Sequence, residues 1–337
     1  MTHVENPGIR DGRSRLRMKV EIVNGDLFGA FMKITNAQFS RCLDPSIVCA
    51  KPAIRAHSIQ NARVLDAIAS DGHVVAPIVR STRAGGPVIR LDKVGRNRAS
   101  TFSGLCADHD REIFSPIEVA GMDLDSDEHR FLLAYRAAYR ELHACMETAM
   151  RLQTGYLERV ERGLDPKGVP TEAGLLAAVR LGLAHEMFRY KVALDDAHAS
   201  RDFAALSHDL VELRVEAPTV AVCSLFSFDH EVKSAESLLR VHLNVLPLAE
   251  DTTVALFSYR PEDQSPARAR LDRVLNSSGQ HQKYELSRLI LQSCENFVLS
   301  PDYFDSWDED KVLAVEAYFS KTLVLPSEDE SPHLYLF

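Results

Sequence analysis

Apolar and polar positions alternate in short runs along the first third of the chain, which predicts a small α+β unit. The run "RMKVEIVNGDLFGAFMKI" begins with a period of two and contains Asn-Gly, as β-hairpins do. Residues 59–68 place Ile, Val and Leu at helical spacing, with Ser58 as the expected N-cap. Two short strands, "HVVAPIV" and "GPVIRL", are expected on either side of a Gly-Gly turn. After Cys106, a short helix is expected to end at Pro116.

The centre of the chain predicts a helical hairpin. From residue 126 to about residue 162, apolar side chains recur every three or four positions: Leu132, Tyr135, Tyr139, Leu142, Met146 and Ala149. The run "GLDPKGVP" interrupts this pattern, and a second helix is expected from Pro170-Thr171 to about Leu194. We interpret the apolar stripe as the core of the hairpin. The alternative is a surface for a protein partner or for a second copy of the chain.

The last part of the chain returns to strand patterns and then to helices. Four runs rich in Val, Leu and Phe predict strands: "LVELRVE", "TVAVCSLFSF", "LLRVHLNVLPL" and "TTVALFSYR". Helices are expected at about 265–276, 281–294 and 309–322. Strands followed by helices predict an α+β domain with a mostly antiparallel sheet. The predicted domains are residues 1–122, 123–208 and 209–337.

Composition narrows the class of protein. The chain has 337 residues, of which 45% are hydrophobic, enough to bury a sizeable core. No apolar run reaches the ~18 residues of a membrane helix, and the N-terminus carries charges where a signal peptide needs apolar residues. A cytoplasmic location with reduced thiols and no contact with a membrane is therefore expected.

Charge is distributed unevenly along the chain. The net charge is -9, but the first hundred residues hold 16 Lys and Arg against eight Asp and Glu. A basic segment attached to an acidic body is what a local site for nucleic acid looks like. The alternative is that the basic run "RDGRSRLRMK" is a tail without a partner.

The six cysteines fall into two groups. Cys145, Cys223 and Cys294 sit in apolar patterns and are expected in the core. The other group holds three cysteines and one histidine, a ligand set that structural zinc binds: Cys42, Cys49, Cys106 and His109. The Cys-x-x-His pair closes a tight turn, whereas Cys-x6-Cys is looser than the usual zinc spacing. The alternative is unrelated thiols with His109 on a helix surface.

Two stretches resemble a known family. "RAHSIQ" looks like the histidine strand of the HNH, or ββα-metal, nucleases, and "TFSGLCADHD" is similar to the segment that forms half of their zinc knuckle and begins the metal-binding helix. The resemblance covers roughly residues 40–115. It implies that His57 is the general base and that Asp110 holds a catalytic Mg²⁺ or Mn²⁺, beside a structural zinc.

Several positions depart from the HNH pattern. Ala56 stands where a carboxylate often precedes the base, Thr101 occupies the usual central Asn position, and Asp110 replaces the last His. The resemblance implies a zinc-containing module that binds nucleic acid and cleaves it, and an effector or accessory role in bacterial defence or a toxin system suits this architecture. The competing hypothesis is a scaffold or ligand-binding protein in which zinc only holds a small fold together. The sequence contains no Gly-x-Ser-x-Gly, phosphate loop or Gly-x-Gly-x-x-Gly motif.

Overall fold

The computed structural model describes residues 38–45, 49–82, 86–119, 121–169, 171–228, 238–323 and 331–337. The chain divides into two compact units. The larger unit combines Ser40–His143 with Glu186–Phe337, and it contains every strand named below. Within its described residues, the smaller unit consists mainly of Ala144–His185, which are the distal parts of two long helices.

A seven-stranded sheet forms the framework of the larger unit. Its strands lie in the order β3 (Gly86–Gly95), β2 (His73–Thr82), β9 (Phe297–Leu299), β6 (Val220–Phe228), β7 (Leu239–Ala249), β8 (Thr252–Tyr259) and β5 (Ser207–Arg214). Each neighbouring pair runs antiparallel. The prediction of an α+β fold with a mostly antiparallel sheet is therefore confirmed.

Strand β9 joins two distant parts of the sequence in this one sheet. Leu299 pairs with Val75 of β2 on one side and with Val220 of β6 on the other. As a result, the sheet contains strands from both the first and the third predicted domains. The domain boundaries near residues 122 and 208 stay predictions.

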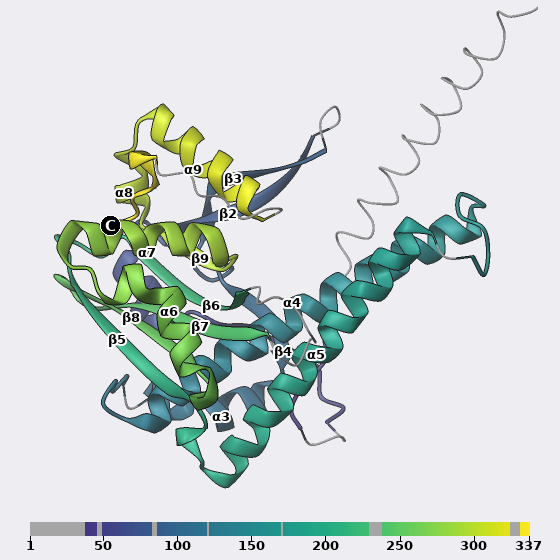
Figure 1. Cartoon of the computed structure of the whole chain (residues 1–337), viewed down its shortest axis with the longest axis horizontal. Helices are drawn as coiled ribbons and strands as arrows, with labels where there is room; N and C mark the ends of the chain where they lie inside the picture. Colours follow the sequence, from purple (N-terminus) through teal and green to yellow (C-terminus); the bar gives the residue numbers. More distant parts are fainter. Residues whose placement is uncertain are drawn as a thin grey trace, which may run out of the picture. The chain divides into compact units, whose positions relative to one another are not determined.

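Side chains alternate between the two faces of the sheet, and each face packs against its own helices. On β7, Val241, Leu243 and Val245 belong to an apolar core. That core also contains residues of α6 (Gln264–Leu275), α7 (Gly279–Ser293) and α9 (Glu309–Thr322). Figure 1 shows α6 and α7 lying across this face. On the opposite face, Nε2 of His242 and the hydroxyl of Tyr190, on the second long helix, share a 2.8 Å hydrogen bond.

The two long helices match the predicted hairpin in position and extend it. They are α4 (Asp127–Glu161) and α5 (Glu172–Ser200). Their proximal halves meet in the larger unit, where Tyr135 of α4 donates a 2.5 Å hydrogen bond to Asp195 of α5. In the smaller unit, Arg159, in the last turn of α4, forms a 2.6 Å ion pair with Asp165, which lies just after the helix.

The predicted metal-binding segment forms a strand–strand–helix unit. Strand β1 (Ile54–His57) pairs antiparallel with β4 (Thr101–Leu105), and α3 (Ala107–Val119) follows β4 directly. Between β1 and β4 the chain makes a π-helical turn (Asn61–Leu65), the short α2 (Asp66–Ile68) and the hairpin of β2 and β3. One further short helix, α8 (Pro301–Asp305), follows β9.

Two local predictions were wrong, and others fall outside the described residues. Helix α3 continues three residues past Pro116, which lies inside it. Ser58 does not cap the following helix, because its hydroxyl donates instead to the carbonyl of Ser100 at 3.0 Å. The predicted N-terminal hairpin "RMKVEIVNGDLFGAFMKI" and Gly85 of the Gly-Gly turn lie outside the described residues.

Candidate metal centre

Two parts of the strand–strand–helix unit bring the four predicted ligands together. Cys42 and Cys49 lie on the segment of residues 40–55, called here the metal loop, which ends with the first two residues of β1. Cys106 follows the last residue of β4, and His109 lies in the first turn of α3. Strand β4 and helix α3 therefore hold one ligand pair, while the metal loop brings the other pair to it.

The distances among the four side chains suit a tetrahedral ion. One donor atom from each residue lies within 4.8 Å of all the others. The Sγ atoms of Cys49 and Cys106 are 3.8 Å apart, and Cys42 Sγ lies 3.3 Å from His109 Nδ1. Zinc bonds of about 2.3 Å to sulfur and about 2.0 Å to nitrogen place tetrahedral ligands roughly 3.8 and 3.5 Å apart. The four residues lie close enough together to hold a metal ion.

Backbone hydrogen bonds fix the metal loop against β4. The amide of Cys106 donates to Cys42 Sγ at 3.4 Å, and the amide of Leu43 donates to the carbonyl of Gly104 at 2.8 Å. A Cβ atom at Gly104 would lie 2.8 Å from the Phe102 ring, so a side chain there would displace that ring. Sulfur that accepts an amide hydrogen bond is typical of a coordinated thiolate.

The carboxylate of Asp44 faces the side of the His109 ring that points away from Cys42. Its Oδ1 atom lies 3.6 Å from Nε2 of His109, while Nδ1 of the same ring faces Cys42. A carboxylate on the far nitrogen favours the tautomer in which Nδ1 is free to bind a metal. Both side chains are partly buried, which strengthens this electrostatic contact.

The surroundings of Cys42 and Cys106 shift the pKa values of the two thiols in opposite directions. Burial raises the pKa of Cys42 to about 11. Burial also acts to raise the pKa of Cys106, but the amides of His109 and Asp108 outweigh it and leave that pKa below its ordinary value. Cys106 precedes the first residue of α3, where free amides and the helix dipole stabilise a thiolate. Cys106 is therefore the thiol best prepared to ionise and bind a cation.

His57 lies at the end of β1, opposite Thr101 of β4. Its Nε2 atom lies 3.2 Å from the carbonyl oxygen of Arg96. Burial lowers the pKa of His57, and nearby Arg136 and Arg96 act in the same direction. The imidazole is consequently neutral near pH 7, as a general base must be.

Asp110 lies one residue beyond His109 in the first turn of α3. Burial raises its pKa, opposed by the positive charge of Arg136. Arg136 itself forms a 2.6 Å ion pair with Glu118, and both of these charges act on His57 as well as on Asp110. Among the described residues, the four-residue cluster is the only group of His, Cys, Asp or Glu close enough to hold a metal, and it includes neither His57 nor Asp110.

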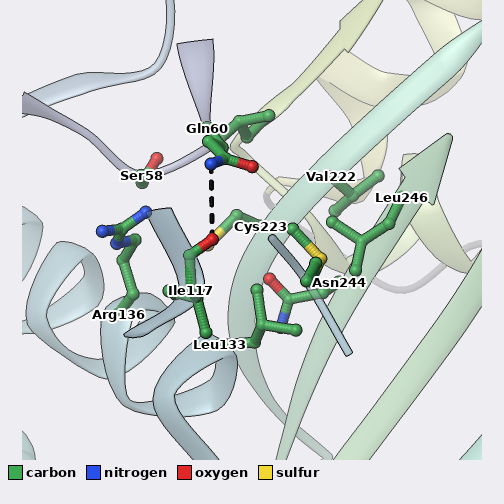
Figure 2. A pocket seen from close by; sticks show the side chains of 11 residues that line it. Ser58, Gln60, Ile117, Leu133, Arg136, Val222, Cys223, Asn244 and Leu246 are labelled. Atoms are coloured by element: carbon green, nitrogen blue, oxygen red, sulfur yellow. Dashed lines mark hydrogen bonds between the residues drawn. The ribbon is translucent and has the colours of Figure 1, made fainter. Parts of the chain in front are cut away.

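A small buried cavity separates the strand–strand–helix unit from the sheet. Its lining includes Gln60, Arg136 and Asn244, and its volume is about 10 Å³ (Figure 2). Gln60 donates to the carbonyl of Ile117 across one side of it, as the dashed line in Figure 2 shows. This volume admits about one water molecule, so the cavity is too small for a substrate.

The remaining cysteines lie away from the cluster. Cys223 and Cys294 are buried in the sheet region as predicted, and burial raises the pKa of each to about 12. Cys145 is only partly buried, so its assignment to the core was wrong. In the part of the chain that the structure describes, no helix combines the length and apolar character that crossing a bilayer requires.

Two residues beside the cluster carried no signal in the sequence. Asp44 sits in a polar turn without a recognisable motif, and Lys191 lies in the middle of an apolar helix. Comparison of the chain with protein-family models, curated proteins and solved structures finds no match. The functional assignment therefore depends on the residues and their geometry.

Proposed function

We propose that the four-residue cluster is a structural zinc centre. Three thiolates and one imidazole complete a four-coordinate site and leave no position for a substrate, as is usual for structural zinc. Proximity supports this assignment, since the four donor atoms all lie within 4.8 Å of one another. Calcium and magnesium fit poorly, because they prefer oxygen ligands.

We further propose that this centre belongs to an HNH-like module that binds nucleic acid and cleaves it. One observation carries this proposal: β1, β4 and α3 form a strand–strand–helix unit with the four-residue cluster beside it, His57 at the end of its first strand and Asp110 in its helix. This is the arrangement that the resemblance to HNH nucleases implies. The excess of basic residues in the first hundred positions suits a polyanionic substrate.

In this proposal each residue has a defined task. Neutral His57 accepts a proton from water at its free ring nitrogen, while the carbonyl of Arg96 holds the ring in place. Asp110 contributes a carboxylate to a bound Mg²⁺ or Mn²⁺, which would stabilise negative charge on the scissile phosphate. Zinc keeps the strand and the helix in register but takes no part in the chemistry.

A non-catalytic scaffold is the second candidate function, and a specific observation favours it. His57 and Asp110 do not gather a third acidic or imidazole ligand among the described residues. A cation held by Asp110 alone would rely on water and substrate phosphates for its remaining ligands. In the scaffold hypothesis the module binds a protein or a ligand, and zinc only maintains its fold.

Cleavage separates the two candidates. Wild-type protein is incubated with single- and double-stranded DNA and RNA and with Mg²⁺ or Mn²⁺, beside His57→Ala and Asp110→Ala. Cleavage should fall at least about 100-fold in both variants, since each removes a group that acts on the reacting atoms. His73→Ala is the matched control, because His73 also bonds a backbone carbonyl but is itself exposed at the start of β2.

Zinc content is measured for every variant, so that loss of activity is not confused with loss of the fold. Both catalytic variants should keep the wild-type amount of zinc. If the wild type cleaves no nucleic acid but binds it with an affinity that falls steeply with salt, the module binds without cutting. Salt-independent or absent binding supports the scaffold.

A further inference from the structure

A fully buried lysine lies behind the metal loop. The side chain of Lys191, on α5, is 1% exposed, and that of its partner Asp195 is 5% exposed. Lys191 Nζ lies 2.8 Å from Asp195 Oδ2. Asp195 also accepts the hydrogen bond from Tyr135, so both of its oxygens have partners from the two helices.

The same ammonium group reaches out of the helices to the metal loop. It donates a hydrogen bond to the backbone carbonyl of Leu43, and it lies 4.5 Å from the centre of the Tyr139 ring. An ammonium group has three N–H donors, and these three neighbours can satisfy all of them. Leu43 stands between the ligand Cys42 and Asp44, which faces the histidine ligand.

Stability alone does not account for this buried charge. Taking an ammonium and a carboxylate out of water is costly, and a packed apolar pair of similar volume is often equally stable or more so. What an apolar side chain cannot provide is a bond to the Leu43 carbonyl. None of the described residues from 40 to 55 is itself buried, whereas this bond ties the metal loop to a fully buried side chain.

We propose that Lys191 is a positioning residue for the metal centre. By holding the carbonyl of Leu43, it fixes the backbone on which Cys42 and Asp44 stand, so that the thiolate and the carboxylate meet His109 before the ion arrives. A preorganised site binds more tightly because less ordering remains to be done on binding. The inference rests on the proposed zinc centre and adds that its affinity depends on the α4–α5 helix pair.

The test uses the full chain and removes the ion pair as a unit. Lys191→Met/Asp195→Asn deletes both charges while leaving an amide oxygen to accept from Tyr135. Zinc affinity is measured by competition with a chromophoric chelator, at a temperature where the protein is folded. Loss of a group that orients a ligand typically weakens metal binding about 10- to 100-fold, and a decrease of this size is expected. The cobalt-substituted variant should also show an altered thiolate charge-transfer band.

A matched control separates positioning from general destabilisation. Glu285 and Arg288 of α7 form another buried ion pair, 3.4 Å long, on a helix that packs against the other face of the sheet. Arg288→Met/Glu285→Gln should lower stability but leave zinc affinity within about twofold. Lys191→Arg is a second variant: it keeps a charge beside Asp195 but moves the donor from the Leu43 carbonyl, so its affinity should also fall.

Each outcome bears on a different claim. Weaker zinc binding in the Lys191 variants alone supports the inference. Wild-type affinity in those variants, or an equal loss in the α7 control, overturns it while leaving the zinc centre intact. A wild-type chain that binds no zinc overturns the proposed centre itself, and with it this inference.

Discussion

The metal loop and the apolar face of the sheet are stabilised in opposite ways. On β7, Leu243 and its neighbours are fully buried and pack against three helices. In the metal loop, none of the described residues from 40 to 55 is buried, although Cys42 and Cys49 reach the cluster. One region is ordered by the removal of apolar surface from water, whereas the described residues of the other bury no side chain completely.

This difference gives the proposed zinc ion a physical task. Without apolar burial, the loop must offset the ordering of its backbone, which costs about 1–2 kcal/mol per residue, through a few strong contacts. Exposed ion pairs contribute little: Lys51 and Asp108 lie 2.5 Å apart, but both are more than half exposed. In the proposed centre, four bonds to zinc would contribute about 10–16 kcal/mol, a large part of what ordering this loop costs.

Removal of zinc should have the largest effect, and it should be local. Cys106→Ser, or treatment with a chelator, should release about one zinc per chain and leave the metal loop open to exchange and proteolysis. Elemental analysis together with hydrogen exchange resolved by peptide checks this. Peptides of residues 40–55 should lose protection by several kcal/mol of opening free energy, whereas β7 peptides should change little.

Cys294→Ser is the control for this experiment, because Cys294 is buried in the sheet core and far from the ligand set. It should lower stability and keep zinc. Protection of the metal loop that survives complete removal of zinc would contradict the comparison, since another interaction would then have to order it.

A substitution in the sheet core should lower the free energy of unfolding strongly without changing metal binding. Leu243→Ala removes a fully buried side chain and should lower the free energy of unfolding by about 2–5 kcal/mol. Leu248→Ala, at a position of the same strand that is 47% exposed, should stay within about 0.5 kcal/mol. Urea unfolding of zinc-loaded protein measures both. Loss of zinc from the folded Leu243 variant would show that the two regions are not independent.

Acid should weaken the other face of the sheet through its buried histidines. Burial lowers the pKa of His242 to about 3 and that of His208 to about 4. The folded state therefore keeps them neutral, while the unfolded state takes up protons below about pH 6.5. Above pH 6.5 the two histidines do not reduce the free energy of unfolding. As the pH falls from 6.5 toward 4, that free energy decreases, by about 2 kcal/mol per histidine at pH 5.

His242→Gln should flatten this pH dependence of unfolding, because Gln carries no titrating group but can still bond Tyr190. The same substitution at His281, which is exposed on α7, serves as the control. Both variants keep the proposed metal centre and any acid sensitivity that it has, so they differ only in the buried histidine. Equal pH dependence in the two variants would mean that acid acts mainly through the metal centre.

Periodicity predicted the long elements well because their apolar positions repeat over several turns. The stripe that includes Tyr135, Tyr139 and Leu142 is buried on α4, and the four C-terminal strand patterns each became a strand. The grouping of Cys42, Cys49, Cys106 and His109 was also predictable, because few residue types bind metal ions in such sets and the chain collects them, and the structure brings their donor atoms together. In these cases the local sequence already contains the physical cause.

Features that depend on distant contacts left no such pattern. Strand β9 has three residues, too few for a period, yet it joins β2 to β6. Pro116 lies inside α3, where the packing of the helix outweighs the lost hydrogen bond. The contacts of Asp44 and Lys191 form only when α3 and α5 meet the metal loop.

The smallest expected effect concerns Asp44. It tests whether this carboxylate acts on His109 or holds the metal loop itself. Asp44→Asn keeps the size of the side chain but removes the charge that faces His109 Nε2 at 3.6 Å. Zinc affinity should fall about tenfold, the lower end for a group that orients a ligand, while the free energy of unfolding of the zinc-free protein stays within about 0.5 kcal/mol. Chelator competition and urea unfolding measure the two quantities.

Asp305→Asn, which weakens a surface ion pair with Lys93, should leave both unchanged. If Asp44→Asn instead destabilised the zinc-free protein as much as it weakened zinc binding, the carboxylate would be holding the loop rather than the histidine ligand, and the metal would not be the main source of order there.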